Sequence, residues 1–176
     1  MSALRAGTVA LRDPATLLWT APVALVLVVP LLRREPVPLG VLPILVALAI
    51  IVVTDLRARL IPDVVTLPAL AWAIGVAVAD GRAAASLVGA SVVGGALWVL
   101  AVIARGGIGG GDVKLGAVVG AALGWESAVL VLAVSQLVGA VIAAGLLLTR
   151  RGTRRTRLPI GSVIAILAAL TILSAA

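Results

Sequence analysis

Long apolar runs separated by short polar stretches dominate this chain. A helix needs about 20 mostly apolar residues to cross the hydrocarbon core of a bilayer. The pattern therefore predicts an all-α fold, a polytopic transmembrane helical bundle with six to seven membrane segments. These segments cover residues 16–32, 37–54, 64–79, 84–104, 113–124, 127–148 and 158–175.

Two of these runs are weak spans, which is why the predicted number is six to seven. Residues 113–124 are too few to cross comfortably and 64–79 are marginal, so tilting or local thinning of the bilayer is expected there. The first run is longer than a signal-peptide core and is expected to be retained. The longest polar stretch, Thr149 to Arg157, is only a loop. Residues 1–176 are thus expected to form a single transmembrane domain without a separate soluble domain.

The basic residues predict how the bundle is oriented. With seven spans and a cytoplasmic N-terminus, eleven of the 14 basic residues fall inside and three outside, as the positive-inside rule requires. The Arg33-Arg34 pair is the misfit. A multi-pass protein of the bacterial inner membrane is expected. The residues placed inside are Arg5, Arg12, Arg57, Arg59, Arg105, Lys114, Arg150, Arg151, Arg154, Arg155 and Arg157.

Composition narrows the chemistry. The chain is 62% apolar and 12% charged, and its net charge of +7 comes from residues that flank apolar runs. Topology explains this charge better than nucleic acid does, so the lipid bilayer is an expected partner and nucleic acid is not. Cysteine and histidine are both absent. This absence excludes cysteine and histidine-dependent nucleophiles and the usual zinc ligands, so carboxylate chemistry without metal or cofactor is predicted.

Asp55 directly follows the unbroken apolar run that ends at Thr54. A carboxylate at the centre of a membrane helix costs about 2.5–3.5 kcal/mol, and it usually faces a protein interior or a wet cavity. A functional role is one explanation for Asp55. An ion pair with Arg59, one helical turn later, is the other.

Asp112 follows the glycine-rich residues 106–111. A flexible loop and a helix cap are two structural explanations, whereas a phosphate-binding loop lacks its Gly-Lys-Ser/Thr ending. Asp112 and the glycines at 116, 120 and 124 recur every four residues and share one helical stripe. Because small residues let membrane helices approach closely, we expect the helix that ends at Asp55 to pack in this groove.

Both aspartates fall at the cytoplasmic end of their predicted segments. Two carboxylates held close together share one proton, which provides an acid and a base for the activation of water. Asp63, directly after Pro62, is a third candidate, with helix capping as its structural alternative.

Two motifs resemble those of a known family. Residues 54–63, TDLRARLIPD, resemble the first aspartate motif of the type IV prepilin peptidases, and residues 109–115, GGGDVKL, resemble their glycine-x-glycine-aspartate motif. A later LPIG at 158–161 fits the same order. The resemblance covers the chain from about residue 45 to its end.

The resemblance implies an intramembrane aspartic endopeptidase. Its substrates would be type IV prepilins or pseudopilins, whose leader peptide is removed at the cytoplasmic face, in association with pilus or secretion machinery. No cofactor is implied. Asp55 and Asp112 would be catalytic, and the motif or supporting residues would be Gly109, Gly111, Lys114, Asp63 and Pro62.

The chain also departs from many members of that family. It lacks a cytoplasmic domain with paired cysteines, which the family links to N-methylation, and so resembles the short, peptidase-only form found with tight-adherence pilus or pseudopilin systems. Ser162 stands where a second proline is common.

Other classes of membrane protein explain less of the sequence. A small proton-coupled transporter or channel subunit would use membrane carboxylates, but the internal repeats expected of it are not found. A purely structural subunit leaves the glycine-aspartate segment unexplained. Presenilin-like proteases would need a tyrosine-aspartate motif, and the chain has no tyrosine.

Overall fold

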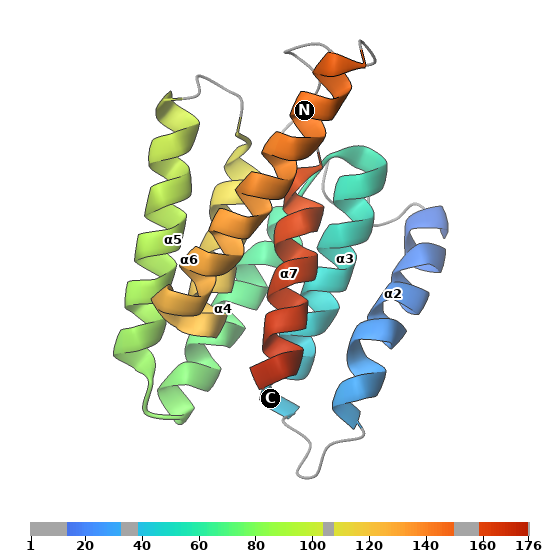
Figure 1. Ribbon diagram of the computed structural model, residues 1–176. Coiled ribbons are helices and arrows are strands. Elements are labelled where there is room, and N and C mark those ends of the chain that lie inside the picture. Colours follow the sequence, from blue (N-terminus) through green and yellow to red (C-terminus); the bar gives the residue numbers. More distant parts are fainter. Residues whose placement is uncertain (1–13, 33–38, 104–107, 150–158, 176) are drawn as a thin grey trace.

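A computed structural model describes residues 14–32, 39–103, 108–149 and 159–175 (Figure 1). Within these ranges the chain is helical and contains no strand, which confirms the predicted all-α fold. The elements are α2 (Pro14–Leu32), the short 3-10 helix η1 (Leu39–Val41), α3 (Leu42–Ala58), α4 (Asp63–Ala79), α5 (Ala83–Ile103), α6 (Gly110–Leu148) and α7 (Ile160–Ala175).

Helix α6 is broken at Gly124. This residue has φ 76° and ψ 170°, a conformation that glycine adopts without the steric penalty of a Cβ atom. In Figure 1 the first part of α6 (yellow) descends, and the second part (orange) rises again toward the end at which α6 begins. The predicted division into segments 113–124 and 127–148 therefore matches two helical parts.

The helices are those of a membrane bundle. Among the described residues, α5 and α6 are long and apolar enough to cross a bilayer, and α4 and α7 are shorter apolar helices. The orientation predicted from the basic residues is not tested, because most of these lie outside the described ranges. They are Arg5, Arg12, Arg33, Arg34, Arg105, Arg150, Arg151, Arg154, Arg155 and Arg157.

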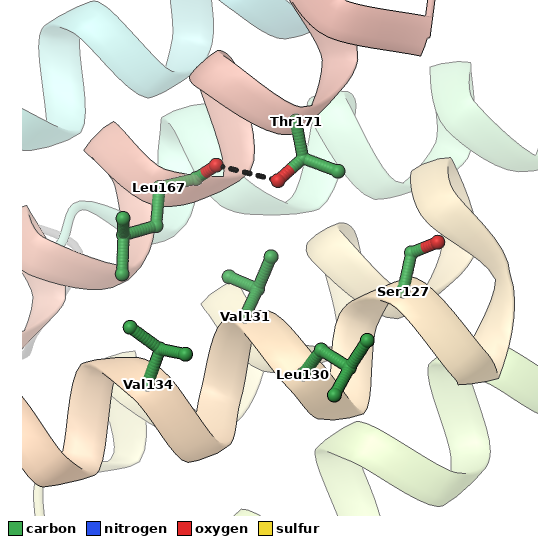
Figure 2. A pocket seen from close by; sticks show the side chains of 6 residues that line it. All are labelled: Ser127, Leu130, Val131, Val134, Leu167 and Thr171. Atoms are coloured by element: carbon green, nitrogen blue, oxygen red, sulfur yellow. Dashed lines mark hydrogen bonds between the residues drawn. The ribbon is translucent and has the colours of Figure 1, made fainter.

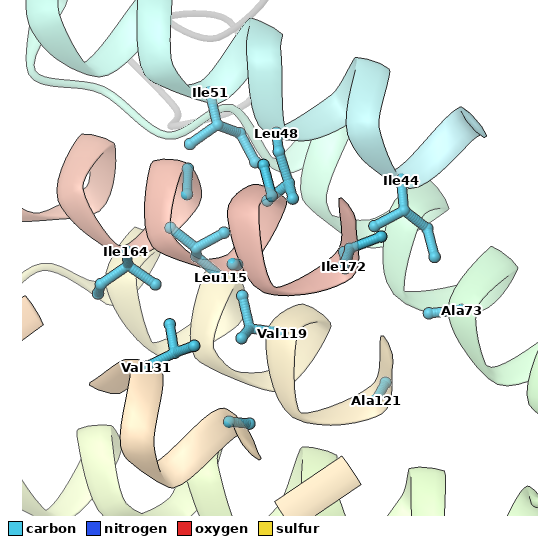
Figure 3. Close-up of a cluster of buried hydrophobic side chains, with 14 of the residues drawn as sticks. Ile44, Leu48, Ile51, Ala73, Leu115, Val119, Ala121, Val131, Ile164 and Ile172 are labelled. Carbon is cyan, nitrogen blue, oxygen red and sulfur yellow. The ribbon is translucent and has the colours of Figure 1, made fainter. Parts of the chain in front are cut away.

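Helix α7 lies between α3 and α6 at the centre of the core (Figure 3). Leu48 and Ile51 of α3 and Leu115 of α6 are buried in the same cluster as Ile164 of α7. The inner face of α7 also carries small buried residues at 161, 165, 168 and 169, which allow helices on both sides to approach closely.

The glycine stripe of α6 packs against α5, not α3. A Cβ atom on Gly116 would meet Leu97 and Val93, and one on Gly120 would collide with the backbone of Gly89. The prediction that the Asp55 helix packs in this groove is therefore wrong. Small residues on both α5 and α6 bring these two backbones into contact, and α3 packs against α7 instead.

One end of the bundle gathers the segments that carry the candidate residues. Helix α3 ends there, and α4, α6 and α7 begin there (Figure 1). Four helix termini, distant in sequence, thus bring polar side chains together at this end.

Candidate active site

Asp55 lies in the last turn of α3 and is only 6% exposed. Its Oδ2 atom accepts hydrogen bonds from the backbone N–H of Ser162 at 2.6 Å and from the Ser162 hydroxyl at 2.8 Å. Ser162 is in the first turn of α7, where backbone N–H groups lack an acceptor within their own helix. The buried carboxylate and the helix start therefore satisfy one another.

The alternative explanation for Asp55, an ion pair with Arg59, is not realised between these two described residues. Arg59 ends α3 in a left-handed conformation with φ 50°, and its backbone N–H donates to the carbonyl of Asp55 at 2.8 Å. Asp55 and Arg59 are thus linked by the backbone hydrogen bond that ends α3.

Asp112 lies in the first turn of α6. Its Oδ2 atom accepts the backbone N–H of Gly109 at 3.1 Å, and its own N–H donates to the Gly109 carbonyl at 3.1 Å. The helix-cap explanation is therefore correct for one carboxylate oxygen. The other, Oδ1, faces α7.

Gly161 lies between the two aspartates. A Cβ atom built on Gly161 would be 3.1 Å from Asp55 Oδ2 and 3.2 Å from Asp112 Oδ1. Because both distances start from the same point, Asp55 Oδ2 and Asp112 Oδ1 cannot be farther apart than their sum. The structure thus brings together the two carboxylates that the sequence singled out, with one α7 glycine beside both.

Asp63 and Lys114 form an ion pair that joins the starts of α4 and α6. Lys114 Nζ lies 2.6 Å from Asp63 Oδ1, and the two side chains are 40% and 17% exposed. Asp63 is the first residue of α4, next to the N-cap position, and its Oδ1 atom is bound by Lys114. Pro62 occupies the N-cap position of α4, and its carbonyl accepts the N–H groups of Val65 and Thr66.

The two motif glycines differ. A Cβ atom on Gly111 would lie 2.8 Å from Ile61 Cβ, so no larger residue fits without movement. Gly109 has an extended backbone, and a Cβ atom there would have an ordinary 3.5 Å contact with Asp112. Steric contact therefore explains glycine at 111 but not at 109.

Sequence reasoning missed two residues of this site. Ile61 packs against Gly111, as described above, and also against Gly161, where an added Cβ atom would lie 2.6 Å from Ile61 Cδ1. An apolar residue in a hydrophobic chain carries no chemical signal, although its place directly before Pro62 is part of the first motif. Ser162 was noted only as a departure from a motif, and that departure was the available signal.

A cavity of about 230 Å³ lies elsewhere, between the second part of α6 and α7 (Figure 2). The Thr171 hydroxyl in its wall donates to the Leu167 carbonyl of the same helix at 2.9 Å. None of its lining residues is titratable, so it is not a reaction centre built on carboxylates. It is lined by Ser127, Leu130, Val131, Val134, Leu167 and Thr171.

The segments that form the site match a known family. The profile of the type IV leader peptidase family matches residues 42–144, more than half of the chain, including both aspartates. The chain belongs to the type IV leader peptidase family.

Individual relatives agree with this assignment. The chain is 40% identical over 121 residues to a prepilin leader peptidase/N-methyltransferase of Bacillus subtilis, which covers 67% of this chain and 48% of that protein. It is 37% identical over 131 residues to a protein of the same description in Aeromonas salmonicida, over 70% and 44% of the two chains. The chain thus spans about half the length of these curated relatives. No solved structure matches it.

Proposed function

We propose that this chain is an intramembrane aspartic endopeptidase that removes the leader peptide of type IV prepilins or pseudopilins. The observation that carries the proposal is the approach of Asp55 and Asp112 to one another beside Gly161. Both carboxylates lie within the residues that match the family. The curated relatives named above supply the substrate class through their descriptions as prepilin leader peptidases.

The proposed reaction needs only the two carboxylates and water. Two carboxylates that face the same substrate bond can divide the work, so that one member is the base while the other is the acid. The base removes a proton from a water molecule, whose oxygen bonds to the scissile carbonyl carbon, and the acid polarises the carbonyl oxygen. When the C–N bond breaks, the leaving amine takes up a proton from the pair.

The hydrogen bonds favour Asp55 as the base. It accepts two donors from Ser162, at 2.6 and 2.8 Å, whereas Asp112 accepts the longer bond from Gly109. Two donors hold the Asp55 carboxylate in one orientation, and a general base must point at the water that it deprotonates. We therefore assign Asp55 the role of base and Asp112 that of acid.

The proposed setting is the bacterial inner membrane, with the active-site end of the bundle toward the cytoplasm. The distribution of basic residues along the sequence supports this orientation. A prepilin would place its hydrophobic helix in the bilayer and its basic leader at the cytoplasmic face. The pilus or secretion machinery that uses the product, of the tight-adherence or a pseudopilin type, would be a further partner.

Co-expression of this chain with a prepilin, in a bacterial host without its own prepilin peptidase, tests the function. Mass spectrometry of the membrane fraction should show a product cut between the basic leader and the hydrophobic helix. The matched control is the double variant Asp55→Asn/Asp112→Asn, which should leave the prepilin intact. A full-length prepilin beside abundant wild-type protein, for every pilin class tried, contradicts the proposal.

A further inference from the structure

We propose that Ser162 is a positioning residue for Asp55, and that Gly161 beside it sets how closely the two carboxylates approach. This inference rests on the proposed function, because it assigns α7 a part in the same site.

Ser162 holds one carboxylate oxygen with two donors from a single residue. Both its N–H and its hydroxyl donate to Oδ2 of Asp55, and Ser162 is itself only 2% exposed. Two donors on one oxygen restrict rotation of the carboxylate more than one donor would. The bonds also join α3 to α7 across 107 residues of sequence.

No other polar side chain of α7 can take over this task. In the described sequence of α7 the remaining polar residues are Thr171 and Ser174, which lie more than two helical turns further on. Their hydroxyls donate to carbonyls of their own helix. Ser162 is therefore the side chain through which α7 orients Asp55.

Gly161 contributes by having no side chain. A Cβ atom there would crowd Asp55 Oδ2, Asp112 Oδ1 and Ile61 Cδ1 together, the last at 2.6 Å. The two adjacent α7 residues thus have separate effects. Gly161 leaves room for the two carboxylates to come close, and Ser162 fixes the orientation of Asp55.

The experiment compares steady-state cleavage of a prepilin by membranes that contain equal amounts of each variant. Ser162→Ala keeps the backbone donor and removes the hydroxyl. We expect kcat to fall about ten- to a hundredfold, the usual effect of losing a hydrogen bond to a charged group, with KM within about twofold of wild type. Ser162→Thr keeps both donors and should restore kcat to within about threefold.

Ser86→Ala is the matched control. The buried Ser86 hydroxyl also joins two helices, through a 2.9 Å bond to the Ala121 carbonyl, but it takes no part in the site. Its removal should leave kcat within about twofold of wild type. Ser162→Cys replaces the hydroxyl with a thiol, which is a weaker donor, and should give a kcat between those of wild type and Ser162→Ala. It replaces the alanine variant in the comparison if that variant does not accumulate.

The possible failures are distinguishable. Wild-type kcat in Ser162→Ala or Ser162→Cys, together with an inactive Asp55→Asn, overturns the positioning role and leaves the proposed function standing. A change in KM alone also overturns it, since Ser162 would then bind substrate. Wild-type cleavage by Asp55→Asn overturns the catalytic role of Asp55, and a prepilin left intact by the wild-type protein overturns the proposed function. Gly161→Ala should lose at least as much kcat as Ser162→Ala.

Discussion

Ile61 packs so closely against Gly111 that a Cβ atom on the glycine would lie 2.8 Å from the Cβ atom of Ile61. The contact joins the loop after α3 to the first turn of α6, one residue before Asp112. The branched Cβ of Ile61 cannot move as the end of a flexible side chain would. This contact therefore fixes the position of the first turn of α6, which carries Asp112, against the loop that follows the Asp55 helix.

Gly111→Ala should impair cleavage through this contact. Overpacking of this kind typically costs about 1–3 kcal/mol, and here relief of the strain would displace Asp112. We expect kcat for prepilin cleavage to fall at least about tenfold. Gly110→Ala is the control, because nothing lies within 4 Å of its added Cβ atom. Equal activity of the two alanine variants would show that the Ile61 contact does not position the site.

The ion pair between Asp63 and Lys114 should contribute modestly to stability. Both side chains are partly exposed, so its worth is about 1 kcal/mol or less. Asp63→Asn and Lys114→Met should each lower the midpoint of thermal unfolding in detergent by a few degrees. The double variant should lose about as much as either single one, since only one interaction is removed. Fully additive losses would mean that the two residues act separately.

Gly120→Ala should destabilise the bundle, because the added Cβ atom would collide with the backbone of Gly89 on α5. We expect the α5–α6 contact to loosen and the unfolding midpoint to drop by several degrees. Gly95→Ala adds the same atom on α5 where nothing lies within 4 Å, and it should leave the midpoint unchanged. If Gly120→Ala is as stable as Gly95→Ala, the close α5–α6 packing is incorrect.

The sequence predicted the helical segments well because apolar runs bounded by polar residues carry most of that information. It also placed Asp55 and Asp112 at one end of the bundle. It did not predict which helix fills the α6 groove, since several apolar helices contain small residues and their patterns do not specify a partner. The part played by Ser162 was hidden for a related reason, because a hydrogen bond across 107 residues leaves no local pattern.

Loss of one carboxylate at a time tests the catalytic pair most directly. Asp55→Asn and Asp112→Asn keep the shape of each side chain and remove its ability to exchange a proton. The control is Asp80→Asn, whose exposed carboxylate pairs with Arg82 in the turn between α4 and α5. Rates of prepilin cleavage are compared at equal amounts of protein in the membrane. We predict that each site variant loses about 10²–10⁴-fold or more in kcat, while Asp80→Asn cleaves like wild type. Wild-type cleavage by either Asp55→Asn or Asp112→Asn would contradict the pairing of these two carboxylates in catalysis.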